Sequence, residues 1–132
     1  MGESEQHIGS GSGASFDPVE ISQVFEDDVD AVLDLIGLVT ADLPHYAQAL
    51  TNHVGRAEWP EAGRLAHTIK GAAANLYADP VKRLAQTVEH AAKQGRLESI
   101  ADDTVALTAA VAALVQALEQ WAARLRAERK VA

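Results

Sequence analysis

Apolar residues recur at helical spacing along most of the chain. Between residues 29 and 54 they are three or four positions apart, which places them on one face of an α-helix. This stripe consists of Val29, Val32, Ile36, Val39, Leu43, Tyr46, Leu50 and Val54. Pro44 lies within it and removes one backbone hydrogen bond, so we expect a bend near Thr40. A short helix over Val19–Glu26 is predicted before it, because Asp17-Pro18 is typical of a cap followed by proline at the first helical position.

Three further stripes follow, bounded by residues that start or stop helices. Trp59-Pro60 begins the first, Asp79-Pro80 repeats the cap-then-proline signal before the second, and Gly95 is expected to end the second. The first two stripes consist of Ala62, Leu65, Ala66, Ile69, Ala73 and Leu76, and then of Val81, Leu84, Val88 and Ala91 or Ala92. The last has the alternating spacing of a heptad seam, with Ile100, Thr104, Leu107, Val111, Leu114, Leu118, Trp121 and Leu125.

These patterns predict an all-α fold, an antiparallel four-helix bundle in up-down-up-down order with a short extra N-terminal helix. Residues 1–15 are rich in Gly and Ser and are interpreted as a flexible tail or linker, and residues 16–132 as the bundle. The seam of the last helix could instead form a coiled coil between two chains. We expect a monomer, because the other three stripes also need a partner face.

The composition fits this fold and narrows the chemistry. The 132 residues suit one domain and contain no cysteine, which excludes disulfides and thiolate metal sites. The sequence has no His-Glu-x-x-His motif and no Glu-x-x-His pair, so no metal site is predicted. No apolar run approaches the roughly 20 residues of a membrane span, and residues 1–15 lack the apolar core of a signal peptide. We therefore expect a cytoplasmic protein that does not enter the membrane.

Charge is unevenly distributed along the chain. The net charge of −8 argues against nucleic-acid binding, which needs a basic face. Residues 1–55 hold ten acidic residues and no Lys or Arg, whereas residues 56–96 hold seven basic residues against four acidic ones. The basic residues are Arg56, Arg64, Lys70, Lys82, Arg83, Lys93 and Arg96. This region is either ordinary solvated surface or a docking site for an acidic partner or a phosphate.

One histidine occupies a setting that the other histidines lack. On a helical wheel of roughly 100° per residue, the apolar residues of the 62–76 helix point away from His67. The residues within roughly 60° of His67 are small, cationic or proline: Pro60, Gly63, Arg64, Lys70, Gly71 and Ala74. His67 is therefore expected on the solvent face. His45, His53 and His90 are interpreted as surface residues, and Trp59 and Trp121 as core residues.

This setting suits reversible phosphorylation. An exposed imidazole is largely neutral near pH 7, so one ring nitrogen can attack phosphorus. Lys70, one turn later, can partly neutralise phosphoryl oxygens. Gly71 lies almost above the ring, and glycine within a helix costs about 1 kcal/mol relative to alanine. The close approach of another protein would explain a glycine at this position.

The run from Ala66 to Leu76 resembles the signature of the histidine-containing phosphotransfer (HPt) domain family, His-x-x-Lys-Gly followed by small residues and Asn-Leu. The resemblance extends over about residues 17–125. Matching features outside the signature are Asp42-Leu43-Pro44, Trp59, Leu84, Val88-Glu89 and Gly95.

The resemblance implies that His67 is the phosphoacceptor and Lys70 assists, with Gly63, Arg64, Gly71, Ala74 and Glu89 in partner docking. It implies a stoichiometric phosphocarrier more than an enzyme, without a cofactor of its own. The partners would be response-regulator receiver domains, which would supply Mg²⁺, and a hybrid histidine kinase. Some members place a Gln where this chain has Glu89. That glutamate could orient the imidazole or pair with Lys70, but its charge would oppose a phosphoryl group.

Two alternative functions follow from other features. The first is the phosphoacceptor and dimerisation domain of a histidine kinase, a family that follows its histidine with an acidic residue. Thr68 and Ile69 follow His67 here, and the sequence has no Gly-rich ATP-binding segment. The second is an unphosphorylated helical adaptor that binds through its acidic N-terminal half or its heptad seam.

Overall fold

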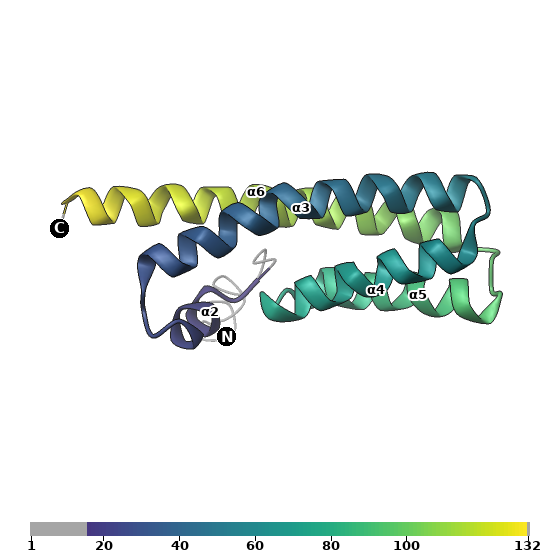
Figure 1. Ribbon diagram of the computed structural model, residues 1–132, viewed down its shortest axis with the longest axis horizontal. Helices are drawn as coiled ribbons and strands as arrows, with labels where there is room; N and C mark the ends of the chain where they lie inside the picture. The colour runs from purple at the N-terminus through teal and green to yellow at the C-terminus, as the bar shows by residue number, and fades with distance from the viewer. Residues whose placement is uncertain (1–15, 132) are drawn as a thin grey trace, which may run out of the picture.

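The computed structural model describes residues 16–131, a range that contains five helices and no strand. The helices are α2 (Pro18–Val24), α3 (Val29–Gly55), α4 (Trp59–Asn75), α5 (Asp79–Gln94) and α6 (Ile100–Val131) (Figure 1). The predicted tail, residues 1–15, lies outside the described residues.

The four long helices form a closed ring of neighbours. α3 packs along α6 and α4, and α5 packs along α4 and α6. Short loops make successive long helices antiparallel (Figure 1). The predicted stripes meet in a single core, whose largest fully buried side chains include Leu43, Leu50, Ile69, Leu76, Leu107, Leu114 and Leu118. The predicted bundle with a short extra N-terminal helix is thus confirmed.

Some helix ends follow the local sequence signals. The Asp17 side chain accepts hydrogen bonds from the backbone N–H groups of Val19 and Glu20, and Gly95 ends α5 in the left-handed conformation, at φ 73°. The prediction that Asp79 caps α5 is wrong. The helix begins at Asp79, Ala78 occupies the cap position, and no side chain hydrogen-bonds there. The Asp79 carboxylate instead lies in the first turn, where its negative charge interacts favourably with the positive end of the helix dipole.

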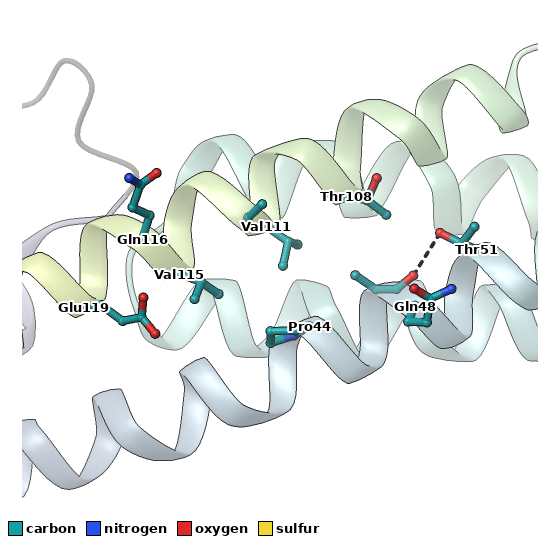
Figure 2. Close-up of a pocket in the computed structure, with 10 residues that line it drawn as sticks. Pro44, Gln48, Thr51, Thr108, Val111, Val115, Gln116 and Glu119 are labelled. Carbon is teal, nitrogen blue, oxygen red and sulfur yellow. Dashed lines mark hydrogen bonds between the residues drawn. The ribbon is translucent and has the colours of Figure 1, made fainter.

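α3 continues through Pro44, and its ribbon changes direction part-way along, as the proline predicts (Figure 1). Pro44 lines a groove of about 450 Å³ between α3 and α6, with Val111 and Val115 on the opposite side (Figure 2). All the residues that line it belong to α3 and α6. The groove is therefore separate from the α4–α5 pair that carries His67.

α6 buries the predicted seam from Ile100 to Trp121, and Leu125 is partly buried. The ring centroids of Trp121 and Phe16 are 5.3 Å apart, so Phe16, two residues before α2, packs on the inner face of α6. Arg129, near the end of α6, pairs with Asp30 in the first turn of α3. The two longest helices are therefore tied together at this end by an ion pair.

The expectation that no stretch is long and apolar enough for a membrane span is wrong for α6. An 18-residue window within Ile100–Lys130 has a mean hydropathy of 1.4, and 28% of it is buried. Exposed alanines, such as Ala109 and Ala113, raise the hydropathy without requiring burial. A core helix of a soluble protein passes the same test of length and composition, so the finding is weak evidence for a span.

Candidate functional site

α4 directs His67 away from the core. Its buried positions, Ala62, Ala66, Ile69 and Ala73, line the opposite side of the helix. The His67 side chain is 65% exposed, as the helical wheel predicts. The imidazole is therefore open to a macromolecular partner on one side and to its neighbours on α5 on the other.

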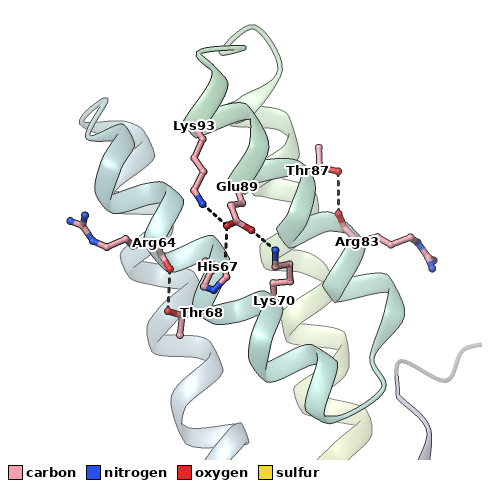
Figure 3. Close-up of polar contacts among 8 residues, drawn as sticks. All are labelled: Arg64, His67, Thr68, Lys70, Arg83, Thr87, Glu89 and Lys93. Carbon is pink, nitrogen blue, oxygen red and sulfur yellow. Dashed lines mark hydrogen bonds and ion pairs between the residues drawn. The ribbon is translucent and has the colours of Figure 1, made fainter.

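The His67 ring is held by a carboxylate from the next helix. Its Nδ1 atom lies 2.9 Å from Oε2 of Glu89, which is 3% exposed (Figure 3). The same oxygen accepts a hydrogen bond from Lys93 Nζ at 2.8 Å, and the other oxygen, Oε1, pairs with Lys70 Nζ at 2.8 Å. One buried carboxylate therefore joins three nitrogen-bearing side chains from two helices.

This environment keeps Glu89 ionised. Burial by itself would raise the pKa of its carboxyl, but hydrogen bonds from Lys70, Lys93 and His67, with the charge of Lys70, lower it from 4.5 to about 2. An ionised carboxylate can only accept hydrogen bonds, so Nδ1 of His67 donates to it. In the neutral ring this assigns the proton to Nδ1 and leaves the lone pair on Nε2, away from Glu89.

The cluster has an excess of positive charge. Glu89 contributes one negative charge, and Lys70 and Lys93 contribute one positive charge each. The side chain of Lys70 is 26% exposed and that of Lys93 is 60% exposed, so both can also meet an anion at the surface. The repulsion expected between Glu89 and a phosphoryl group is therefore offset locally.

Three of the predicted docking residues lie on the exposed surface near His67. Arg64, Gly71 and Ala74 are exposed, and a Cβ atom added at Gly71 would meet no other atom within 4 Å. Nothing within the fold therefore requires glycine at position 71. The close approach of a partner protein would explain the glycine instead.

The other two predicted docking residues, Gly63 and Glu89, are buried in the bundle. A Cβ atom at Gly63 would lie 3.7 Å from Cβ of Ala92 and 3.7 Å from Cγ of Lys93. Gly63 is on the same side of α4 as His67, but α5 packs over it there. The Glu89 carboxylate contacts His67, Lys70 and Lys93 beneath the surface.

Two features of the molecule were not predicted from the sequence. Lys93 belongs to the cluster, and its spacing of four residues from Glu89 is a helical pairing signal that could have identified it. His53, interpreted as a plain surface residue, has its Nδ1 atom 2.6 Å from Oε1 of Glu58. His45 and His90 are exposed, as predicted, and Trp59 is only partly buried.

No group of three or more His, Asp or Glu side chains that could hold a metal ion occurs among residues 16–131. The supply of Mg²⁺ by a partner stays a prediction.

A search against protein-family models matches the Hpt domain over residues 20–128. The chain belongs to the Hpt domain family. Neither the curated proteins nor the solved structures give a match. The match covers every helix except the first two residues of α2 and the last three of α6. Hpt domains take part in histidine phosphotransfer in phosphorelays, and the family implies interaction with receiver domains and histidine kinases.

Proposed function

We propose that His67 carries a phosphoryl group between aspartates of receiver domains. The observation that supports this most directly is the contact of 2.9 Å between Nδ1 of His67 and the buried carboxylate of Glu89. It fixes one nitrogen as a donor and leaves the other as the nucleophile on an exposed ring. Family membership supports the reaction class, and the geometry supports Nε2 as the acceptor atom.

The transfer step follows from this assignment. Nε2 of His67 attacks the phosphorus of an aspartyl phosphate, the P–N bond forms, and the P–O bond to the aspartate breaks. The bonding electrons leave with the aspartate oxygen, so the carboxylate is regenerated. The Nδ1 proton stays on the ring, which becomes a cation paired with Glu89, and the reverse step with a second aspartate releases the group.

Lys70 and Lys93 are expected to stabilise the charge on the transferring group. Phosphoryl transfer depends mainly on positioning and on neutralising charge at the phosphoryl oxygens. Both Nζ atoms lie 2.8 Å from Glu89 oxygens and are therefore held beside the imidazole. The chain offers a nucleophile and cations, so we propose a stoichiometric carrier, with Mg²⁺ bound by the receiver and no cofactor of its own.

Arg64, Gly71 and Ala74 would form part of the surface on which a receiver docks. The donor and acceptor would be response regulators or the receiver of a hybrid histidine kinase. We further propose that the domain acts as a cytoplasmic monomer, which sedimentation at micromolar concentration tests. A stable dimer that Leu114→Glu abolishes, with the chains still folded, would contradict the monomer.

The experiment that tests the acceptor atom is phosphorylation of the ¹⁵N-labelled chain by phosphoramidate and by a phosphorylated receiver. We expect an acid-labile phosphate on His67, with the ¹⁵N chemical shift of Nε2, and not of Nδ1, reporting attachment. A phosphate on Nδ1, or on another histidine, would contradict the proposal. No labelling by either donor would favour the unphosphorylated adaptor.

A further inference from the structure

A second polar hollow lies on the outer face of α5 and the loop that follows it. It has a volume of about 430 Å³ and is lined by Arg83, Gln86, Thr87, His90 and Arg96. None of these residues belongs to the cluster around Glu89. At roughly 100° per residue, Gln86 lies about 60° and His90 about 100° around α5 from Glu89. By the same measure Arg83 lies about 120° and Thr87 about 160° from Glu89, so the hollow extends from the flank of the Glu89 position to the far side of α5.

The two arginines of the hollow form no ion pair with the part of the chain that the structure describes. Among residues 16–131, neither Arg83 nor Arg96 has a carboxylate oxygen within 4.0 Å, whereas Lys70 and Lys93 both pair with Glu89. The chain as a whole has a net charge of −8, so a cationic hollow on it is a local feature. Two positively charged residues lining one hollow favour an anion there.

Stabilisation of α5 explains only some of the charged residues that line the hollow. Cations near the C-terminal end of α5 stabilise the helix dipole, which explains Arg96 and His90. Arg83 is at the fifth position of α5, near the end where the dipole disfavours a cation. Stabilisation of the helix therefore does not explain why Arg83 shares a hollow with Arg96.

The donors of the hollow match an oxyanion. Guanidinium groups present paired N–H donors to carboxylate or phosphate oxygens, and the Gln86 amide can add another. The Thr87 hydroxyl already donates to the Arg83 backbone carbonyl at 3.1 Å, so it can only accept. The hollow is open and shallow, which suits a side chain on the surface of a protein better than an enclosed small molecule.

We propose that this hollow is a second docking point that takes a carboxylate-bearing segment of the same receiver domain that meets His67. The proposal rests on the proposed function, because it assigns to the receiver a face that extends from α4 over α5. A contact away from the reacting atoms lets the chain select a partner by charge without changing the chemistry at His67. The acidic character of the partner segment follows from the charge of the hollow.

The test is calorimetric titration of the full chain with unphosphorylated receiver domains, using the receiver that binds the wild type most tightly. All variants also carry His67→Gln, so binding is measured without phosphotransfer. Arg83→Gln with Arg96→Gln should raise Kd about 10-fold at low salt, and the difference should vanish near 0.5 M salt. Thermal unfolding checks that the variant is folded.

The matched control is Arg124→Gln with Arg126→Gln, which removes the same charge from the exposed surface of α6. It should change Kd less than about twofold. An equal effect of both pairs, no effect of the first pair, or no receiver binding at all would overturn the docking point. A Kd effect confined to the first pair would support the docking point. If the wild-type chain, tested separately, accepts no phosphoryl group on His67 from any donor, the same result would reject the proposed phosphotransfer and leave the docking point standing.

Discussion

The bundle contains two histidine–carboxylate pairs that differ in which partner is exposed. His53 contacts Glu58 at 2.6 Å across the end of α3, within one local turn of chain. Its side chain is 27% exposed and that of Glu58 is 42% exposed. Nδ1 of His67 lies 2.9 Å from Oε2 of Glu89 on the next helix. The His67 side chain is 65% exposed and the Glu89 side chain is 4% exposed.

The two pairs therefore offer their imidazoles different settings. The His53 pair is local and half open to water, so it serves mainly to close the α3–α4 connection. The His67 pair places the anion in the interior, holds it with two lysines and leaves the ring outside. The His53 pair also has a cation nearby, because Nη1 of Arg56 lies 3.9 Å from the same Glu58 oxygen. Only the second arrangement combines an exposed ring with a buried carboxylate.

The largest expected effect separates the two histidines by function. His67→Gln should fold normally and accept no phosphoryl group, because the attacking nitrogen is lost. His53→Gln should be labelled at the wild-type rate. Incorporation of acid-labile phosphate from a phosphorylated receiver measures both, and label on the His67→Gln chain would show that the acceptor lies elsewhere.

The second prediction compares how much the carboxylates of Glu89 and Glu58 contribute to the free energy of unfolding. Because its folded-state pKa of about 2 is below the ordinary 4.5, ionised Glu89 contributes roughly 3 kcal/mol, fully present above about pH 4.5 and lost as the pH falls towards 2. Glu89→Gln should therefore lower the free energy of unfolding by about that amount at pH 7, with the gap closing at acid pH. Glu58→Gln should cost less than about 1 kcal/mol.

Denaturant unfolding at several pH values measures these differences. A gap between the wild type and Glu89→Gln that stays constant from pH 7 to pH 2 would be inconsistent with an ionised, buried Glu89.

The third prediction ranks the two lysines that the His53 pair lacks. Lys70→Ala should slow phosphotransfer roughly 10- to 100-fold, because it removes a partly buried cation beside the ring. Lys93→Ala should slow it less, because the more exposed Lys93 side chain is better screened by water. Single-turnover transfer rates at matched helicity give the ranking, and a larger effect of Lys93 would reverse the proposed roles.

The smallest expected effect concerns the space around the ring. Gly71→Gln has room for its side chain and should stabilise the folded protein by up to about 1 kcal/mol, because glycine is a poor helix former. The same side chain should weaken receiver binding by obstruction. Thermal unfolding and calorimetric titration measure the two effects, and unchanged receiver affinity would remove the steric explanation for Gly71.

The long helices could be predicted because each apolar stripe obeys one spacing rule, whatever it packs against. Their ends were less predictable. Ala57 and Tyr77 adopt the left-handed conformation just after α3 and α4, at φ 59° and 53°. Glycine is the usual residue there, so the glycine rule identified only the end at Gly95.

The site was predictable where it depends on one helix and not where it depends on two. The helical wheel placed His67 and Gly71 correctly on the solvent side. It could not show that α5 covers Gly63, because packing between helices is not encoded in the periodicity of either one. The role of Glu89 was open for the same reason, since it is 22 positions from His67 in sequence.

The unequal lengths of the helices have a consequence for motion. α6 has 32 residues and α5 has 16, or about 48 Å against 24 Å at 1.5 Å per residue. The α4–α5 pair therefore covers only part of α3 and α6, and the C-terminal end of α6 extends beyond it (Figure 1). In hydrogen–deuterium exchange, amides near Lys130 should exchange first and those between Leu107 and Leu118 last. Local opening at the far end of the rod can then occur without loosening the helices that hold His67.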